Sequence, residues 1–148
     1  MFSNCIYPLN SLPKNLRLID TGCFWNSVLT FDGKLPETLF EISSDAFLNC
    51  ASNSKFILPE SLKYIGDNAF EGMRNLKSIY FPSSLQEVGS TILGRCPQLK
   101  EIHVSGDIPD FGYSILSSDI DYECTFYVNK QLTYIIDALR PNYKVIEE

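Results

Sequence analysis

The side chains with the most reactive chemistry in this chain are five cysteines and one histidine. The cysteines are Cys5, Cys23, Cys50, Cys96 and Cys124. No two of them form a C-x-x-C pair, so their spacing does not indicate a zinc site or a redox motif. Cys5 and Cys124 lie in irregular ends of the sequence, and their state stays open.

His103 is the only histidine, and catalysis through it would need a nucleophile and an acid beside it. No G-x-S-x-G turn, phosphate-binding glycine loop or H-E-x-x-H helix supplies such groups. Asp119, Asp121 and Glu123 alternate in an acidic stretch, but the ligand spacing and central glycine of an EF-hand loop are absent. We interpret this stretch as a solvated loop. The sequence therefore predicts no enzyme, no cofactor and no metal site.

Composition and charge exclude several classes of partner. The net charge of −6 provides no basic stripe for a nucleic acid backbone, so no nucleic acid partner is expected. No apolar run approaches the roughly 18–20 residues that span a bilayer. The first residues lack the basic and apolar regions of a secretory signal. The 45% hydrophobic content indicates a folded chain rather than a disordered one.

The elements that must position these side chains follow from an internal repeat of 23 residues. Four proline-led segments align at this spacing without gaps: Pro13–Ile19, Pro36–Ile42, Pro59–Ile65 and Pro82–Val88. An aromatic column keeps the same phase downstream: Phe24, Phe47, Phe70 and Leu93. A degraded fifth copy stays in phase through Ile108, Phe111, Ile115 and Leu116. We predict a solenoid over residues 1–121, with turns at 7–29, 30–52, 53–75, 76–98 and 99–121.

Within each turn the pattern predicts one short strand, a second extended piece and a tight reversal. In Leu76-x-x-Ile79-x-Phe81-Pro82, alternate side chains face the core, and the proline ends the strand because it has no N–H to donate. Stacked strands of this kind form a parallel sheet on one face. The Leu-x-x-Ile/Val-Gly piece crosses the other side, and the Ala-Phe-x-x-Cys segment is expected to form a single helical or 3₁₀ turn.

Two further columns are predicted to support the stack. Short polar side chains that can bond turn backbone recur two residues beyond the proline column: Asn15, Thr38, Ser61, Ser84 and Asp107. Cys23, Cys50 and Cys96 are predicted to be buried structural thiols. Cys50 and Cys96 lie two turns apart, roughly 9–10 Å, which is too far for a disulfide.

The pattern L-x-x-I-x-x-P-x-S-L-x-x-I-G-x-x-A-F-x-x-C resembles the BspA-type (treponema-type) leucine-rich repeat. The segment from Leu76 to Cys96 carries it with departures at Ile92 and Leu93, and the match covers roughly residues 7–111. The resemblance implies a bacterial protein that is extracellular or on the cell surface, in a family with some members that adhere to host matrix proteins.

The two ends differ from the repeat. Cys124–Val128 is expected to be a sixth strand, one residue out of phase, followed by a helix over Lys130–Leu139 capped by Asn129 and a last extended piece at 143–146. We predict that residues 122–148 cap the solenoid, with a sixth ordinary turn as the alternative. The sequence starts in the middle of a turn, so we expect it to be the C-terminal part of a longer array, or a copy that lost its leader.

The outward face of the sheet is the remaining candidate site. By strand alternation, one column reads Lys34, Ile57, Tyr80, His103 and Tyr127. The predicted partner-binding face is completed by Phe31, Lys55, Lys77 and Lys100. Outward aromatic residues are typical of protein-binding surfaces. The alternative is cross-strand stacking that only stabilises the sheet.

The sequence therefore predicts a non-enzymatic recognition or adhesion module. Its expected partner is a protein, such as a host or matrix protein or a cell-surface component. Two alternatives stay open: a structural spacer that displays another domain of a larger surface protein, and an accessory domain of a surface enzyme that acts on glycans.

Overall fold

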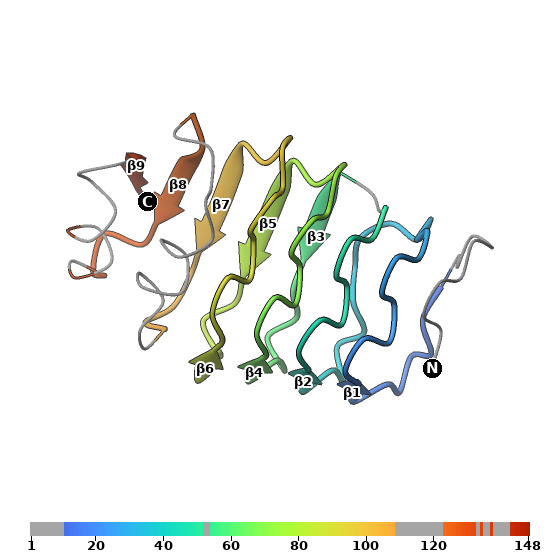
Figure 1. Cartoon of the computed structure of the whole chain (residues 1–148). Helices are drawn as coiled ribbons and strands as arrows, with labels where there is room; N and C mark the ends of the chain where they lie inside the picture. Colours follow the sequence, from blue (N-terminus) through green and yellow to red (C-terminus); the bar gives the residue numbers. More distant parts are fainter. Residues whose placement is uncertain (1–10, 52–53, 109–122, 133, 135–136, 138–142) are drawn as a thin grey trace.

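The chain forms a parallel β-solenoid in the computed structural model, which describes residues 11–51, 54–108, 123–132, 134, 137 and 143–148 (Figure 1). One sheet has four short strands in the order β1 (Leu18–Ile19), β2 (Glu41–Ile42), β4 (Tyr64–Ile65) and β6 (Glu87–Val88). The other has five, in the order β3 (Lys55–Ile57), β5 (Ser78–Phe81), β7 (Glu101–Val104), β8 (Thr125–Val128) and β9 (Lys144–Glu147). All pairings are parallel, as the repeat predicts.

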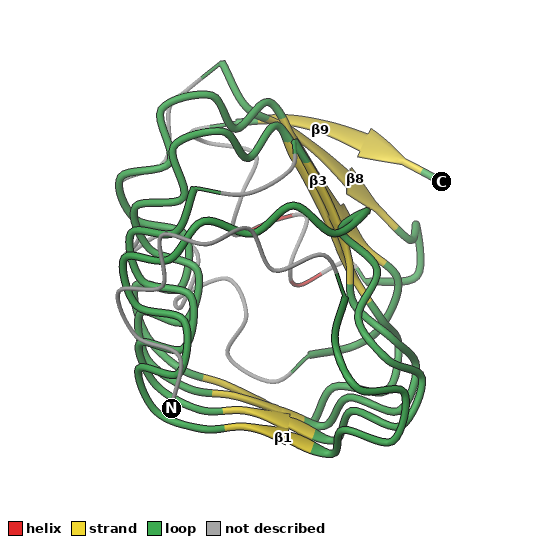
Figure 2. Cartoon of the chain, turned by 90° about the vertical axis from the view of Figure 1, so that its right-hand side faces the viewer, coloured by secondary structure: helices red, strands yellow, loops and turns green. Residues whose placement is uncertain are grey.

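The strand register reproduces the sequence period. Leu18 pairs with Glu41, Glu41 with Tyr64 and Tyr64 with Glu87, each 23 residues further on. Viewed along the stack, the two sheets form two sides of the coil, and tight turns form a third (Figure 2). The predicted fold class is therefore confirmed.

A column of phenylalanine rings fills the centre of the coil. Phe47 stacks on Phe24 with 5.3 Å between ring centroids, and on Phe70 with 5.4 Å. Phe56 of β3 packs edge-on against Phe47 and Phe70. All four rings are buried. The buried aromatic side chains thus form a continuous stack that crosses several turns. This is expected for a repeat array, because each turn completes its core against its neighbours.

The tight turns are not helical, contrary to the prediction. Two positions in each of the four turns that the structure describes have left-handed backbone, four residues apart. The first set is Gly22, Asp45, Asn68 and Thr91, and the second is Asn26, Asn49, Gly72 and Arg95. A left-handed residue cannot continue a right-handed helix. The segment instead forms successive β-turns whose amides bond alternately within one turn and to the next: the Cys23 N–H donates to Asp20 O at 3.0 Å, and the Phe24 N–H donates to Ala46 O at 2.8 Å.

The predicted polar ladder is present at three described positions. The hydroxyls of Thr38, Ser61 and Ser84 each donate to a main-chain carbonyl of the preceding turn. The acceptors are Leu16 O at 2.8 Å, Leu39 O at 2.6 Å and Leu62 O at 2.7 Å. Each bond satisfies a carbonyl at a sharp corner, where no strand partner reaches it.

At the C-terminal end the sixth strand is confirmed as β8, which pairs with β7 one residue out of phase, Thr125 opposite Glu101. Asn129 caps the following segment, because its side-chain Oδ1 accepts the N–H of Gln131 at 3.0 Å. Beyond Leu132 the structure describes only Tyr134 and Asp137 of the predicted helix, and both are helical. The last extended piece is β9, which adds a fifth strand beside β8.

Several sequence predictions lie outside the described residues. They concern Cys5 and the chain start, the acidic residues Asp119 and Asp121, and the fifth-copy residues Phe111, Ile115 and Leu116.

Candidate binding face

The outward face of the five-stranded sheet carries the predicted stripe in register. Ile57 lies opposite Tyr80, Tyr80 opposite His103, and His103 opposite Tyr127. Lys34 continues the row at the N-terminal side through an isolated bridge to Ile57. Alternation along the strands turns these side chains outward, because their neighbours Phe56, Ile79, Ile102 and Phe126 are fully buried. The predicted placement of these five stripe residues is thus confirmed.

Three rings of the stripe form a close parallel stack. Tyr80 and His103 lie 4.0 Å apart between centroids with planes 8° apart, and His103 and Tyr127 lie 4.3 Å apart with planes 5° apart. The Nζ of Lys55 sits 4.3 Å from the Tyr80 centroid, on a diagonal neighbour strand. The imidazole is therefore held between two phenol faces, and an ammonium group lies against one end of the stack.

The stack determines which part of each ring meets solvent. Because the ring faces are turned to one another, a partner would meet ring edges and the two tyrosine hydroxyls rather than open π-faces. His103 is only 17% exposed. Its Nε2 is buried with no hydrogen-bond partner among the described residues, and the nearest carboxylate oxygen is Glu101 Oε2 at 3.6 Å. We call Tyr80, His103 and Tyr127 the aromatic stack.

Phe31 does not belong to this face, so its predicted outward placement is wrong. Its side chain is 6% exposed and packs edge-on against Phe56, with 5.8 Å between centroids. Phe31 lies two residues before the buried Gly33, so along an extended segment both face the core. Ser54, Lys77 and Lys100 share its repeat position, but they turn to solvent at the start of their strands because they are polar, whereas the phenyl ring gains by burial.

Lysines surround the aromatic stack. Lys34, Lys55, Lys77 and Lys100 are all exposed, as predicted, and Lys144 of β9 pairs in register with Thr125 and adds a fifth. Four carboxylates lie on the same strands or beside their ends: Asp32, Glu101, Glu123 and Glu147. Lys100 forms an ion pair with Glu123 at 2.9 Å, with both side chains largely in solvent. Five lysines against four carboxylates thus give this part of an otherwise acidic chain a slight local excess of positive charge.

One residue of the face was missed in the sequence. Ile146 of β9 lies opposite Tyr127 and extends the stripe by one strand. The alternation in Lys144–Glu147 was sufficient to predict a strand. The partner of that strand was not predictable, because the final piece has no place in the 23-residue period.

Two of the described cysteines, Cys50 and Cys96, are buried thiols that bond main-chain carbonyls. None of the described ones, Cys23, Cys50, Cys96 and Cys124, is in a disulfide. The Cys50 Sγ donates to Phe24 O at 2.7 Å and the Cys96 Sγ to Phe70 O at 3.3 Å. Burial raises the pKa of Cys50 to about 12 and that of Cys96 to about 11. Cys23 is only half-buried, so the prediction of full burial is wrong there.

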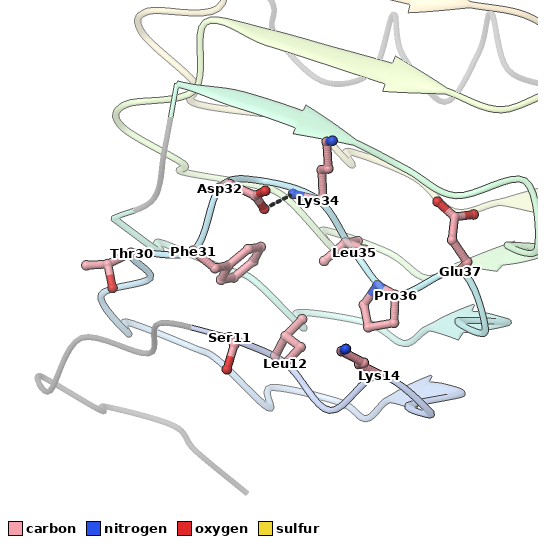
Figure 3. Close-up of a pocket in the computed structure, with 10 residues that line it drawn as sticks. All are labelled: Ser11, Leu12, Lys14, Thr30, Phe31, Asp32, Lys34, Leu35, Pro36 and Glu37. Carbon is pink, nitrogen blue, oxygen red and sulfur yellow. Dashed lines mark hydrogen bonds between the residues drawn. The ribbon is translucent and has the colours of Figure 1, made fainter.

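A groove of about 710 Å³ adjoins the stripe at Lys34 (Figure 3). Phe31, Leu12 and Leu35 give it apolar walls, and its charged residues are Lys14, Lys34, Asp32 and Glu37. The carboxylate of Asp32 accepts the main-chain N–H of Lys34 at 3.1 Å and so occupies one backbone donor at this edge. Lys34 therefore belongs to both the stripe and the groove.

The family model of the BspA type leucine rich repeat region matches residues 1–123 in six copies. The chain belongs to this family. Its fold is also similar to a solved structure described as the crystal structure of pneumococcal vaccine antigen PcpA, with a TM-score of 0.71 and 23% sequence identity. The match covers 95% of this chain and 41% of the PcpA chain. No curated protein matches the sequence.

Within the described part of this BspA-type chain, no group of three histidine, cysteine or carboxylate side chains could hold a metal ion. No described helix is long and apolar enough to cross a bilayer.

Proposed function

We propose that this chain is a non-enzymatic recognition module that binds another protein through the outward face of its five-stranded sheet. The observation that carries the proposal is the aromatic stack. Its three rings carry polar atoms and are aligned on the outward face of the sheet, outside the hydrophobic core. Tyrosine is enriched in protein interfaces, because it supplies a large rigid area and a hydroxyl at low entropic cost. The proposed partner is a matrix protein or a cell-surface component of a host.

The proposed location is outside the cell or on its surface. Membership of the BspA-type family and the similarity in fold to a protein described as a vaccine antigen support this location. The chain spans less than half of the PcpA chain, so the location is proposed for this chain without assigning it any activity of the whole PcpA protein.

The strongest alternative is a spacer. The contact of each ring with its neighbour, at 4.0 and 4.3 Å, is itself a stabilising cross-strand interaction. A stack that serves only the sheet would leave the hydroxyls without a role. The hydroxyls therefore separate the two functions better than the rings do.

The test uses variants that keep or remove the rings. Wild-type protein, Tyr80→Phe/Tyr127→Phe and Tyr80→Ala/Tyr127→Ala are passed over immobilised purified matrix and cell-surface proteins in surface plasmon resonance. Tyr64→Phe on β4 is the matched control, since its hydroxyl donates to Gln86 Oε1 on the other sheet. Recognition through the face predicts about tenfold weaker binding for both double variants and unchanged binding for the control, the tenfold loss corresponding to about 1.4 kcal/mol.

A partner that binds all variants equally would reject this face and favour the spacer. Thermal unfolding of the same variants gives the second readout. The phenylalanine pair should melt with the wild type because the stack is preserved, so its loss of binding could not be ascribed to unfolding.

A further inference from the structure

We propose that the partner segment recognised by this face is an acidic polypeptide with apolar side chains among its carboxylates. This inference rests on the proposed function and specifies its ligand.

The strands of this face and their ends carry five lysines and four carboxylates, whereas the whole chain has a net charge of −6. Lys100 is engaged by Glu123, and Lys55 lies over Tyr80. Lys34 continues the row before Ile57, and Lys77 directly precedes β5, the strand of Tyr80; both are exposed. Their ammonium groups would pair with carboxylates of a partner and favour encounter with an acidic one.

The faces of the three stacked rings are closed to a partner. Sugar rings are commonly bound on open aromatic faces, but here the faces of Tyr80, His103 and Tyr127 are turned to one another. Lys55 covers one end of the stack, and Ile146 is the in-register neighbour at the other. What is left are ring edges and hydroxyls, which can donate to carboxylate and peptide oxygens. This arrangement favours a polypeptide over a neutral glycan.

Apolar side chains lie beside both ends of the aromatic stack. The exposed Ile57 lies beside one end of the stack and the half-buried Ile146 beside the other. Asp32, Glu101 and Glu123 interrupt the lysines and would repel a uniformly sulfated polysaccharide. A polypeptide can alternate carboxylates with apolar side chains and so match both features.

The experiment uses fluorescein-labelled 12-residue peptides of alternating glutamate and leucine, with a glutamine-for-glutamate peptide of the same length as reference. Binding is measured by fluorescence anisotropy in low salt and again at higher salt. The variant Lys34→Glu/Lys77→Glu reverses two charges on the face. The matched control Arg17→Glu/Arg74→Glu makes the same change of charge at exposed residues away from it.

We expect the wild-type protein to bind the glutamine peptide about tenfold more weakly than the acidic peptide. We expect the lysine variant to bind the acidic peptide about tenfold more weakly than the wild type does. In both cases several exposed ion pairs, each of a few tenths to 1 kcal/mol, are lost or reversed. The control pair should stay within about twofold, and added salt should weaken binding of the acidic peptide. Equal binding of the two peptides, no binding of either, or equal effects of the two variant pairs would overturn the proposal.

Two further outcomes would identify a different occupant. Displacement of the acidic peptide by heparin at lower concentration than by unlabelled peptide would assign the face to a sulfated polysaccharide. Self-association in sedimentation velocity that the lysine variant abolishes would assign it to a second copy of this acidic chain. If the tyrosine variants still abolish capture of a matrix protein while the lysine variant does not, the acidic ligand is wrong and the recognition function stands.

Discussion

The five-stranded sheet and the tight-turn side come from the same repeat, yet they constrain their residues in opposite ways. On the turn side, left-handed backbone at two positions in each of the four described turns selects glycine, asparagine or aspartate at six of eight places. At Gly72 even a Cβ would clash with the Asn49 Oδ1. On the sheet face, any side chain that tolerates a strand is compatible with the backbone.

The difference shows where this solenoid has room for function. A turn-side residue is fixed by backbone geometry and by the core beneath it, so its identity says little about a partner. The outward sheet positions are not fixed in this way, and three of them nevertheless carry stacked rings. The backbone therefore does not explain why these three positions carry rings, and they lie on the proposed binding face.

Removing a core ring should have the largest effect. Phe47→Ala deletes a ring that is stacked between Phe24 and Phe70 and touched edge-on by Phe56, and should cost about 3–5 kcal/mol of unfolding free energy. Tyr80→Ala removes a partly solvated ring of the stack and should cost about 0.5–1.5 kcal/mol. Urea unfolding followed by circular dichroism measures both. Equal losses would show that the outward rings are as structural as the core.

Relieving strain on the turn side should stabilise the protein. Thr91 has φ of 55°, in a column where the other turns have Gly22, Asp45 and Asn68. A β-branched residue is poorly suited to left-handed backbone, so Thr91→Asn should raise the unfolding free energy by about 1 kcal/mol. Thr91→Val keeps the branched Cβ and should give no gain in the same urea titration. A stabilised valine variant would contradict the explanation by backbone strain.

Alkaline pH should weaken the turn side through its thiols. The unfolded chain ionises Cys50 and Cys96 near the reference pKa of 9.0, whereas the fold holds them protonated with pKa values of about 12 and about 11. The stabilisation is fully present below pH 9 and is lost as the pH rises toward those values, by about 1 kcal/mol per thiol between pH 9 and 10.

The reference is Cys50→Ala/Cys96→Ala, which lacks both titrations but keeps the other ionisable groups. Its unfolding free energy should fall less steeply from pH 9 to 10 than that of the wild type, although it starts lower because of the lost packing. Parallel curves for the two proteins would show that these thiols do not contribute to the pH dependence.

Much of the fold could be predicted from the sequence because the period is strict where the core needs it. Leu39, Leu62 and Leu85 recur at a spacing of 23 residues because every turn packs on the next. The helical turn was predicted wrongly, because Ala-Phe-x-x-Cys has apolar spacing that fits either a helix or a row of β-turns. The asparagine and glycine columns at the ends of that segment were the signal that distinguishes the two.

The candidate face was only partly predictable. Alternation placed Tyr80, His103 and Tyr127 correctly. The prediction for Phe31 was wrong because this large apolar side chain follows the inward alternation of its segment, although it lies at the start of a strand position. Ring planes and centroid distances depend on rotamers that the sequence does not specify. The parallel stack with its sealed ring faces, and with it the preference for a polypeptide, therefore needed the structure.

The smallest expected effects compare one ion pair from each region. On the turn side, Arg95 Nε and Nη2 donate to the same Glu71 oxygen at 2.8 and 2.7 Å, and the Glu71 side chain is 14% exposed. On the sheet face, Lys100 and Glu123 are 49% and 79% exposed. Glu71→Gln should cost about 1 kcal/mol, and Glu123→Gln should change stability by less than about 0.5 kcal/mol. Thermal unfolding at low and high salt measures both. A larger loss for Glu123→Gln would mean that the charges on the sheet face serve the fold, and they would then no longer count in favour of an acidic partner.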